Sequence, residues 1–129
     1  MRERQKLEPT SDHPITIRAT NQPVVVRRGG IVIADTVDAL TLREAAYPPV
    51  HYIPFDDVDE GAIRPSSGQT YCPFKGDATY YAIVAGGPAV EDAVWCYEEP
   101  FEFVAEIAGR LAFYPQNVEI DVGENIADG

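Results

Sequence analysis

The segment VVVRRGGIVIADT, residues 24–36, decides the fold class. Two runs of mostly β-branched residues, 24–27 and 31–35, flank the turn sequence Arg-Gly-Gly at residues 28–30. β-Branched residues favour extended backbone, and glycine accepts a positive φ at no steric cost. The segment therefore predicts a β-hairpin.

Further strands are expected on both sides of this hairpin. Residues 78–85, ATYYAIVA, predict a strong strand that ends at the turn Gly-Gly-Pro, and residues 93–97 are its expected partner. Residues 111–114 and 118–122 predict a second hairpin, because residues 118–122 alternate strictly between apolar and polar types. Shorter or ambiguous segments are also present: residues 14–20 and 50–55 are expected to be extended, and residues 40–45 fit a strand or a helical turn.

Two segments are not expected to be strands. Residues 56–69, DDVDEGAIRPSSGQ, predict an acidic loop with one helical turn at 58–62. Residues 101–108 predict the one short helix, because Pro100 suits a first helical turn and Gly109 a helix end.

The pattern as a whole predicts a mainly β protein built from antiparallel hairpins. No βαβ unit is visible, which excludes the usual Rossmann setting for a nucleotide. A chain of 129 residues suits one core. We expect a flexible N-terminal arm at residues 1–12, a single β domain at 13–123 and a C-terminal tail at 124–129.

Charge and cysteine content narrow the classes of partner. Ten Lys and Arg residues stand against 21 Asp and Glu residues, so the formal net charge is −11. Such a chain is not suited to nucleic acid or to an anionic membrane surface, both of which need basic side chains. With two cysteines and no apolar leader segment, the expected location is cytoplasmic, with reduced thiols.

The segment TYCPFKGDATYY, residues 70–81, carries most of the candidate chemistry. Lys75 lies three residues after Cys72, so its ammonium and the hydroxyl of Thr70 would stabilise a thiolate nucleophile. The sequence alone favours the alternative, in which Cys72 is a small, buried apolar residue at the start of a strand. Lys75 and Gly76 would suit an anion, or else form a strand-entry turn in which an exposed Lys75 pairs with Asp77 or another carboxylate.

Asp57 and the aromatic residues complete the set of candidates. Asp57 follows an extended segment and would act as a general base or cap the turn at Val58. Trp95 and Tyr97 are expected to share one strand face and, with Tyr52, to line a pocket or to fill the core. Residues with metal-ligand spacing are missing, and we expect neither a metal ion nor another cofactor.

Five stretches, taken in this order, resemble a known family: IADT, LREAAYPPVHYIPFDDV, RPSSGQTYCPFKGDATYYAIV, AVWCYEEP and IAGRLAFYPQNVEIDV. They are similar to the small bacterial proteins of the domain of unknown function 427 family, sometimes labelled nucleotidyltransferase-like. The resemblance covers about residues 14–122. It implies a β-tent fold like that of Mss4-like proteins, in which antiparallel sheets pack at an angle.

The family pattern maps onto eight positions of this chain: Tyr52, Asp57, Thr70, Cys72, Lys75, Gly76, Trp95 and Tyr97. The chain departs from the pattern at Phe55, where members tend to have arginine, and at Tyr71, where they often have histidine or arginine. The leading hypothesis is a pocket-bearing domain that binds a small molecule, with Cys72, Lys75 and Asp57 as candidate catalytic residues and the others as ligand-binding residues. The alternatives are an enzyme that uses Cys72 as a nucleophile or redox-active thiol, and a protein–protein interaction module.

Overall fold

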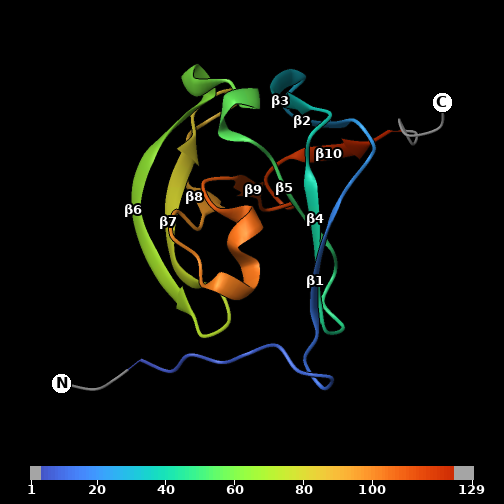
Figure 1. Cartoon of the computed structure of the whole chain (residues 1–129). Helices are drawn as coiled ribbons and strands as arrows, with labels where there is room; N and C mark the ends of the chain where they lie inside the picture. The colour runs from blue at the N-terminus through green and yellow to red at the C-terminus, as the bar shows by residue number, and fades with distance from the viewer. Residues whose placement is uncertain (1–3, 124–129) are drawn as a thin grey trace.

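The computed structural model describes residues 4–123, which form three antiparallel sheets (Figure 1). Within these residues there are ten strands and three short 3-10 helices, so the predicted mainly β class is confirmed. No helix in this part of the chain has the length and apolar character needed to cross a bilayer.

The first sheet has the strand order β1-β4-β5 and lies at the right of Figure 1. Its strands are β1 (Ile15–Ala19), β4 (Leu40–Glu44) and β5 (Val50–Tyr52). The segment at residues 40–45, which the sequence leaves between strand and helix, is thus a strand for most of its length. Register places Ile15 opposite Glu44, and Leu40 opposite Tyr52.

The second sheet contains the hairpin predicted from residues 24–36. It has the order β10-β2-β3, with strands β2 (Val24–Arg28), β3 (Ile31–Thr36) and β10 (Glu119–Val122). Gly29 and Gly30 make the turn with φ values of 56° and 80°, which glycine adopts without strain. The prediction of this hairpin is confirmed.

The third sheet has the order β6-β7-β8-β9 and forms the curved wall at the left of Figure 1. Its strands are β6 (Ile63–Cys72), β7 (Gly76–Ile83), β8 (Val90–Cys96) and β9 (Leu111–Phe113). The predicted pairing of residues 78–85 with residues 93–97 is confirmed by the β7–β8 ladder.

Strand β6 corrects the prediction of a loop over residues 56–69. Pro65 and Gly68 favour a loop in the sequence, but β6 is an edge strand that pairs only with β7. An edge strand tolerates proline, because one side of it needs no ladder hydrogen bond. A register shift between Ser66 and Gln69 accommodates the remaining irregularity. Short 3-10 helices, η1 (Phe55–Asp57) and η2 (Glu60–Ala62), precede the strand.

The second predicted hairpin is wrong in its pairing, although both strands exist. Strand β9 pairs with β8, and β10 pairs with β2 of another sheet. Phe113 lies in the core and the chain then leaves the sheet through a turn at residues 115–117. Alternation of apolar and polar residues identifies a strand but does not identify its partner, because the strand can bury its apolar face in either of the two sheets.

The predicted helix at residues 101–108 is also corrected. Residues Glu102–Ile107 form 3-10 turns, η3, interrupted at Val104, whose φ is −131° and ψ is 30°. Val104 and Ile107 are both fully buried. The apolar residues that suggested an α-helix therefore place two side chains in the core. The segment achieves this burial with 3-10 turns rather than with α-helical geometry.

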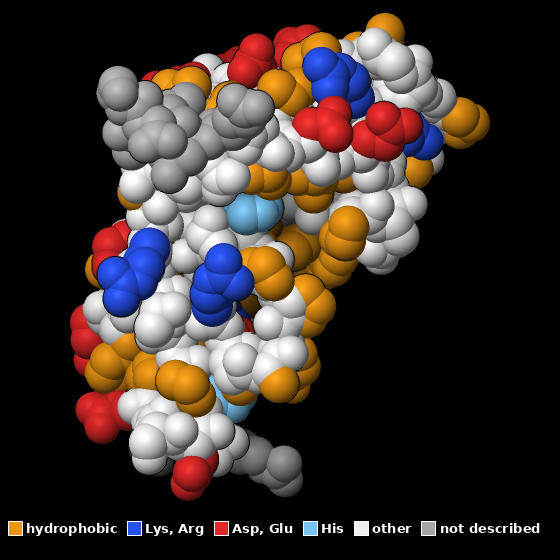
Figure 2. Space-filling model, turned by 90° about the vertical axis from the view of Figure 1, so that its right-hand side faces the viewer, with side chains coloured by type: hydrophobic (Ala, Val, Ile, Leu, Met, Phe, Trp, Pro, Cys, Tyr) orange, Lys and Arg blue, Asp and Glu red, His pale blue; other side chains and the backbone are white. Residues whose placement is uncertain are grey.

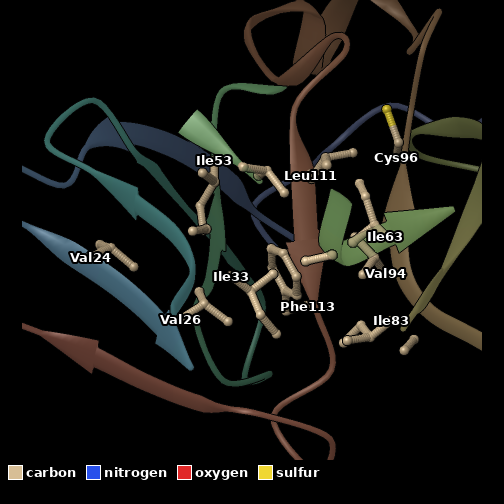
Figure 3. Packing of buried hydrophobic residues seen from close by; sticks show 14 of the residues in the cluster. Val24, Val26, Ile33, Ile53, Ile63, Ile83, Val94, Cys96, Leu111 and Phe113 are labelled. Carbon is tan, nitrogen blue, oxygen red and sulfur yellow. The ribbon is translucent and has the colours of Figure 1, made fainter. Parts of the chain in front are cut away.

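The buried apolar residues form two clusters. The first includes Val24, Ile33, Ile53, Val94, Leu111 and Phe113, and Figure 3 shows their side chains converging from several strands. The second contains aromatic residues, among them Tyr52, Tyr80 and Tyr97. Along β8 the residues alternate, because Val94 and Cys96 belong to the first cluster while Trp95 packs against the second. The prediction that Trp95 and Tyr97 share a face opposite Cys96 is confirmed.

The described part of the expected N-terminal arm, residues 4–12, runs along the turn between β6 and β7. The backbone N–H of Leu7 donates to the carbonyl of Pro73 at 2.9 Å. Arg4 forms an ion pair with Asp77 at 2.6 Å, and Lys6 reaches Glu102 at 2.9 Å. Residues 1–3 and the expected tail at 124–129 lie outside the described residues, so the domain boundaries remain predictions.

Candidate functional site

Two adjoining hollows open between the β1-β4-β5 sheet and strands β7 and β8. The inner hollow has a volume of about 220 Å³ and the outer one about 690 Å³. Six residues line both hollows: Glu44, Tyr47, Pro48, Val50, Lys75 and Trp95. Figure 2, which looks at the molecule from the right-hand side of Figure 1, shows hydrophobic side chains gathered around a hollowed region of this face.

An ion-pair chain forms the polar centre of the inner hollow. The Nζ of Lys75 donates to Oε1 of Glu44, and Oε2 of Glu44 lies 2.7 Å from Nε2 of His13. Lys75 is 8% exposed, although its side chain is cationic. A buried charge needs a partner of opposite sign, and Glu44 supplies it. We call these three residues the Lys75–Glu44–His13 chain.

Three separate segments hold this chain of residues in place. Glu44 ends β4, where it pairs with Ile15, two residues after His13. The ring of His13 stacks on Phe74, with centroids 4.1 Å apart and planes within 4°. Since Phe74 precedes Lys75 in the β6–β7 turn, the stack fixes this turn against the β1–β4 pair.

Electrostatics favour the ionised form of Glu44. Burial by itself would raise the pKa of Glu44, but the hydrogen bonds from Lys75 and His13 together outweigh it. The pKa of Glu44 is therefore below its ordinary value of 4.5. At neutral pH the hollow contains a carboxylate and an ammonium side by side, and their charges largely cancel.

Aromatic side chains surround the ion pair. The indole Nε1–H of Trp95 donates to the hydroxyl of Tyr52 at 3.2 Å, and the two rings are perpendicular. The ring of Tyr114 lies 4.4 Å from that of Trp95, centroid to centroid. Trp95 and Tyr114 thus pack against each other, and both line the inner hollow.

The hydroxyls of Tyr52, Tyr97 and Tyr114 stay neutral at physiological pH. Burial raises the pKa of Tyr52 and of Tyr97, and burial with the bond to Tyr80 raises the pKa of Tyr114 to about 12. The hydroxyl of Tyr80 lies 2.9 Å from Thr70 and 3.5 Å from Tyr114. The hydroxyls of Tyr52, Tyr97 and Tyr114 therefore serve as hydrogen-bond donors and acceptors rather than as bases.

The two cysteines differ in access and environment. Cys72 is half-buried, lines the outer hollow, and has its Sγ 3.8 Å from Nζ of Lys75. Cys96 is buried in the first cluster, where burial and the charge of Glu98 raise its pKa to about 11. Both thiols are free, so no disulfide joins them.

The structure brings together most of the site residues named from the sequence. Tyr52, Lys75, Trp95 and Tyr97 line the inner hollow, and Cys72 lines the outer one. Thr70 lies behind the wall, bonded to Tyr80. Gly76 is buried with a φ of 111°, and it lets the chain turn from Lys75 into β7.

Asp57 is not brought to this cluster. It lies in η1, where the hydroxyl of Thr36 donates to its Oδ2 at 2.7 Å. It lines neither hollow, and it does not cap the turn that follows Val58, because the N-cap of η2 is Asp59, whose side chain accepts from the backbone N–H of Gly61. Asp57 instead joins β3 to the segment that follows β5.

Sequence reasoning missed Glu44, His13, Tyr47 and Tyr114. Glu44 carries a usable signal, because in a strand over residues 40–44 it shares a face with Leu40 and Leu42. A carboxylate on an apolar face predicts a buried charge with a cationic partner. His13 has no comparable signal, because its place depends on strand register between distant segments. No group of three or more potential metal ligands is arranged to hold an ion within residues 4–123.

The chain matches the model of a known protein family. The family model described as domain of unknown function (DUF427) matches residues 16–124, which is most of the chain. Among curated proteins, no relative gives a significant match.

Proposed function

The chain belongs to the DUF427 family, a domain of unknown function, and we propose that it binds a small, flat, uncharged ligand in the inner hollow. One observation carries this proposal: aromatic side chains surround a buried ion pair at an open hollow. Ligand sites are typically concave, mostly apolar and supplied with a few oriented polar groups. A purely structural core would fill this space with side chains.

The walls favour a planar ring. The aromatic rings of Trp95 and Tyr114 line the inner hollow, and Tyr47, which is 66% exposed, lines both hollows. Offset stacking on such rings gives an aromatic ligand about 1 kcal/mol beyond its apolar burial. A tyrosine exposed at a rim also has little to gain from packing within its own chain.

The ion pair favours an uncharged ligand with both a donor and an acceptor. The ammonium of Lys75 has three N–H groups and uses two of them, toward Glu44 and Cys72. The carboxylate of Glu44 accepts from Lys75 and His13 and keeps further lone pairs. A group such as a primary amide matches this arrangement, because its carbonyl accepts from the ammonium while its N–H donates to the carboxylate.

Benzamide is a suitable first probe, and cyclohexanecarboxamide is its non-planar match. We expect benzamide to shift the backbone amide signals of residues beside the inner hollow in a saturable way, and the cyclohexane analogue to bind more weakly. Tyr47→Ala should weaken benzamide binding without unfolding the protein. Tyr71→Ala is the matched control, since Tyr71 lines neither hollow. Equal binding by both variants would contradict the proposal.

A second candidate function is thiol chemistry at Cys72. The observation that favours it is the 3.8 Å approach of the Lys75 ammonium to the Cys72 Sγ, at a position that lines the outer hollow. An ammonium near a thiol stabilises the thiolate form relative to the neutral one. Rapid alkylation of Cys72 at neutral pH, lost in Lys75→Met, would support this role, and a slow reaction in both proteins would exclude it.

We further propose that the three sheets adopt the β-tent arrangement of Mss4-like proteins. The support is that the β1-β4-β5 sheet and the four-stranded sheet face each other as two walls, with β2, β3 and β10 toward one end (Figure 1). An experimental structure superposed on an Mss4-like protein tests this, and a different strand connectivity between the two walls would refute it.

A further inference from the structure

The outer face of the β1-β4-β5 sheet carries a cluster of basic and hydroxyl side chains away from the inner hollow. Register sets Thr16 opposite Arg43, Arg18 opposite Thr41, and Thr41 opposite His51. Opposed residues in an antiparallel pair point to the same face, so these five side chains share one surface. We call them the arginine patch.

The arginine patch is free of acidic partners among the described residues. Elsewhere in residues 4–123, six basic side chains form ion pairs: Arg4, Lys6, His13, Arg27, Arg64 and Lys75. Neither Arg18 nor Arg43 is among them. No carboxylate lines the small hollow of about 180 Å³ that these residues border. In a chain with a net charge of −11, two arginines without a partner carboxylate form a local exception.

A hydroxyl network holds the floor of the arginine patch in place. The buried hydroxyl of Thr41 lies 2.7 Å from that of Thr20 and 3.0 Å from Nδ1 of His51. The network therefore uses one nitrogen of the His51 ring. Within residues 4–123 the other ring nitrogen has no hydrogen-bond partner in the protein.

The electrostatics of His51 agree with a positive local potential. Burial is the main cause that lowers the pKa of His51, and the nearby charge of Arg43 lowers it further. Figure 2 shows basic side chains and a histidine near one another over this face, while acidic side chains are visible mainly toward its margins. A bound anion would offset the positive charge that Arg43 places beside His51.

We infer that the arginine patch binds the phosphoryl group of a small molecule, with Arg18 and Arg43 as the charged ligands. Guanidinium groups present parallel N–H donors that match phosphate oxygens, and such charge-assisted bonds are stronger than neutral ones. Hydroxyl groups at the floor add further donors. The patch lies on the opposite face of β4 from Glu44 and Leu42, so this inference does not depend on the proposed function of the inner hollow.

Backbone amide NMR shifts in the full chain test this inference with three probes: inorganic phosphate, glycerol 3-phosphate, and vesicles containing phosphatidylglycerol. We expect saturable shifts confined to β1, β4 and β5 with one or both soluble probes. The probe that binds more tightly distinguishes free phosphate from a phosphate ester. Vesicle binding is expected to fail because the overall charge is negative, and preferential binding to vesicles would overturn a small-molecule site.

Arg18→Gln/Arg43→Gln should weaken binding of the soluble probe about tenfold or more, since two charge-assisted contacts are lost. Both side chains are exposed, so the variant should fold, and an unchanged melting temperature checks this. Arg64→Gln is the control, because Arg64 pairs with Glu91 on another sheet. Absence of saturable shifts in the wild-type protein, or equal affinity in the double variant, would overturn the inference.

Discussion

The ammonium of Lys75 and the carboxylate of Glu44 form an ion pair whose side chains are only 10% and 15% exposed. The residues come from different sheets, since Glu44 ends β4 and Lys75 lies in the β6–β7 turn. The pair therefore joins the two walls of the inner hollow as well as supplying its polar groups. Removing Glu44 leaves Lys75 buried without a carboxylate partner, and removing Lys75 leaves Glu44 with His13 as its remaining partner.

Lys75→Met should lower the free energy of unfolding by about 3 kcal/mol, because Glu44 would remain buried without its main partner. Lys75→Met/Glu44→Gln should recover part of this loss, since two neutral groups need no ionic partner. Urea denaturation of the wild type and of the three variants, including Glu44→Gln, measures the coupling. Strictly additive effects would show that the two residues stabilise the fold independently.

The pair also predicts a dependence of stability on acid pH. The pKa of Glu44 is lower in the folded protein than its ordinary value of 4.5. The contribution of ionised Glu44 to the free energy of unfolding is therefore complete above pH 4.5, and it is lost as the pH falls through the folded-state pKa. The stability difference between the wild type and Glu44→Gln should shrink as the pH is lowered in this range. A difference that stays constant down to the acid transition would rule out this linkage.

Two glycine turns are expected to be sensitive to substitution in different degrees. Gly30 and Gly86 have φ values of 80° and 79°, so alanine strains the backbone equally at both positions. At Gly86 a Cβ would also overlap the carbonyl oxygen of Arg28, whereas at Gly30 it would meet no atom within 4 Å. Gly30→Ala should cost about 1 kcal/mol, and Gly86→Ala about 2–4 kcal/mol. Equal melting temperatures for the two variants would show that Gly86 is not in close contact with the backbone of Arg28.

The two cysteines should react at different rates with iodoacetamide. Cys72 lines the outer hollow, while Cys96 is buried and its pKa is raised to about 11. Mass spectrometry should therefore find the label on Cys72 in the native protein and on both residues only after unfolding. Cys72→Ser should abolish native labelling. Early labelling of Cys96 would mean that the core around β8 opens readily.

Local sequence patterns predicted those parts of the fold whose hydrogen-bond partners are close in the chain. The β2–β3 hairpin and the β7–β8 pair have their partners within a few residues of a glycine-containing turn, and both are present. Strand β9 pairs with β8 rather than β10, which no pattern of alternation specifies. Strand β6 was missed because Pro65 and Gly68 suggest a loop, although an edge strand accepts both.

The candidate site was predicted in its residue types more than in its geometry. Lys75, Cys72, Tyr52 and Trp95 were identified from composition and strand-end position. Their pairing partners were not, because the β1–β4 register brings His13 to Glu44 across 31 positions of the chain. Residues joined only by tertiary register leave no local signature in a single sequence.

Trp95 is the only tryptophan of the chain and lies in the wall of both hollows, so its fluorescence reports directly on the central claim that the inner hollow binds a flat ligand. The account predicts a saturable change in Trp95 emission when benzamide is added, and a clearly weaker change in Tyr47→Ala. No saturable change with benzamide, or a titration curve that Tyr47→Ala leaves unaltered, would contradict it.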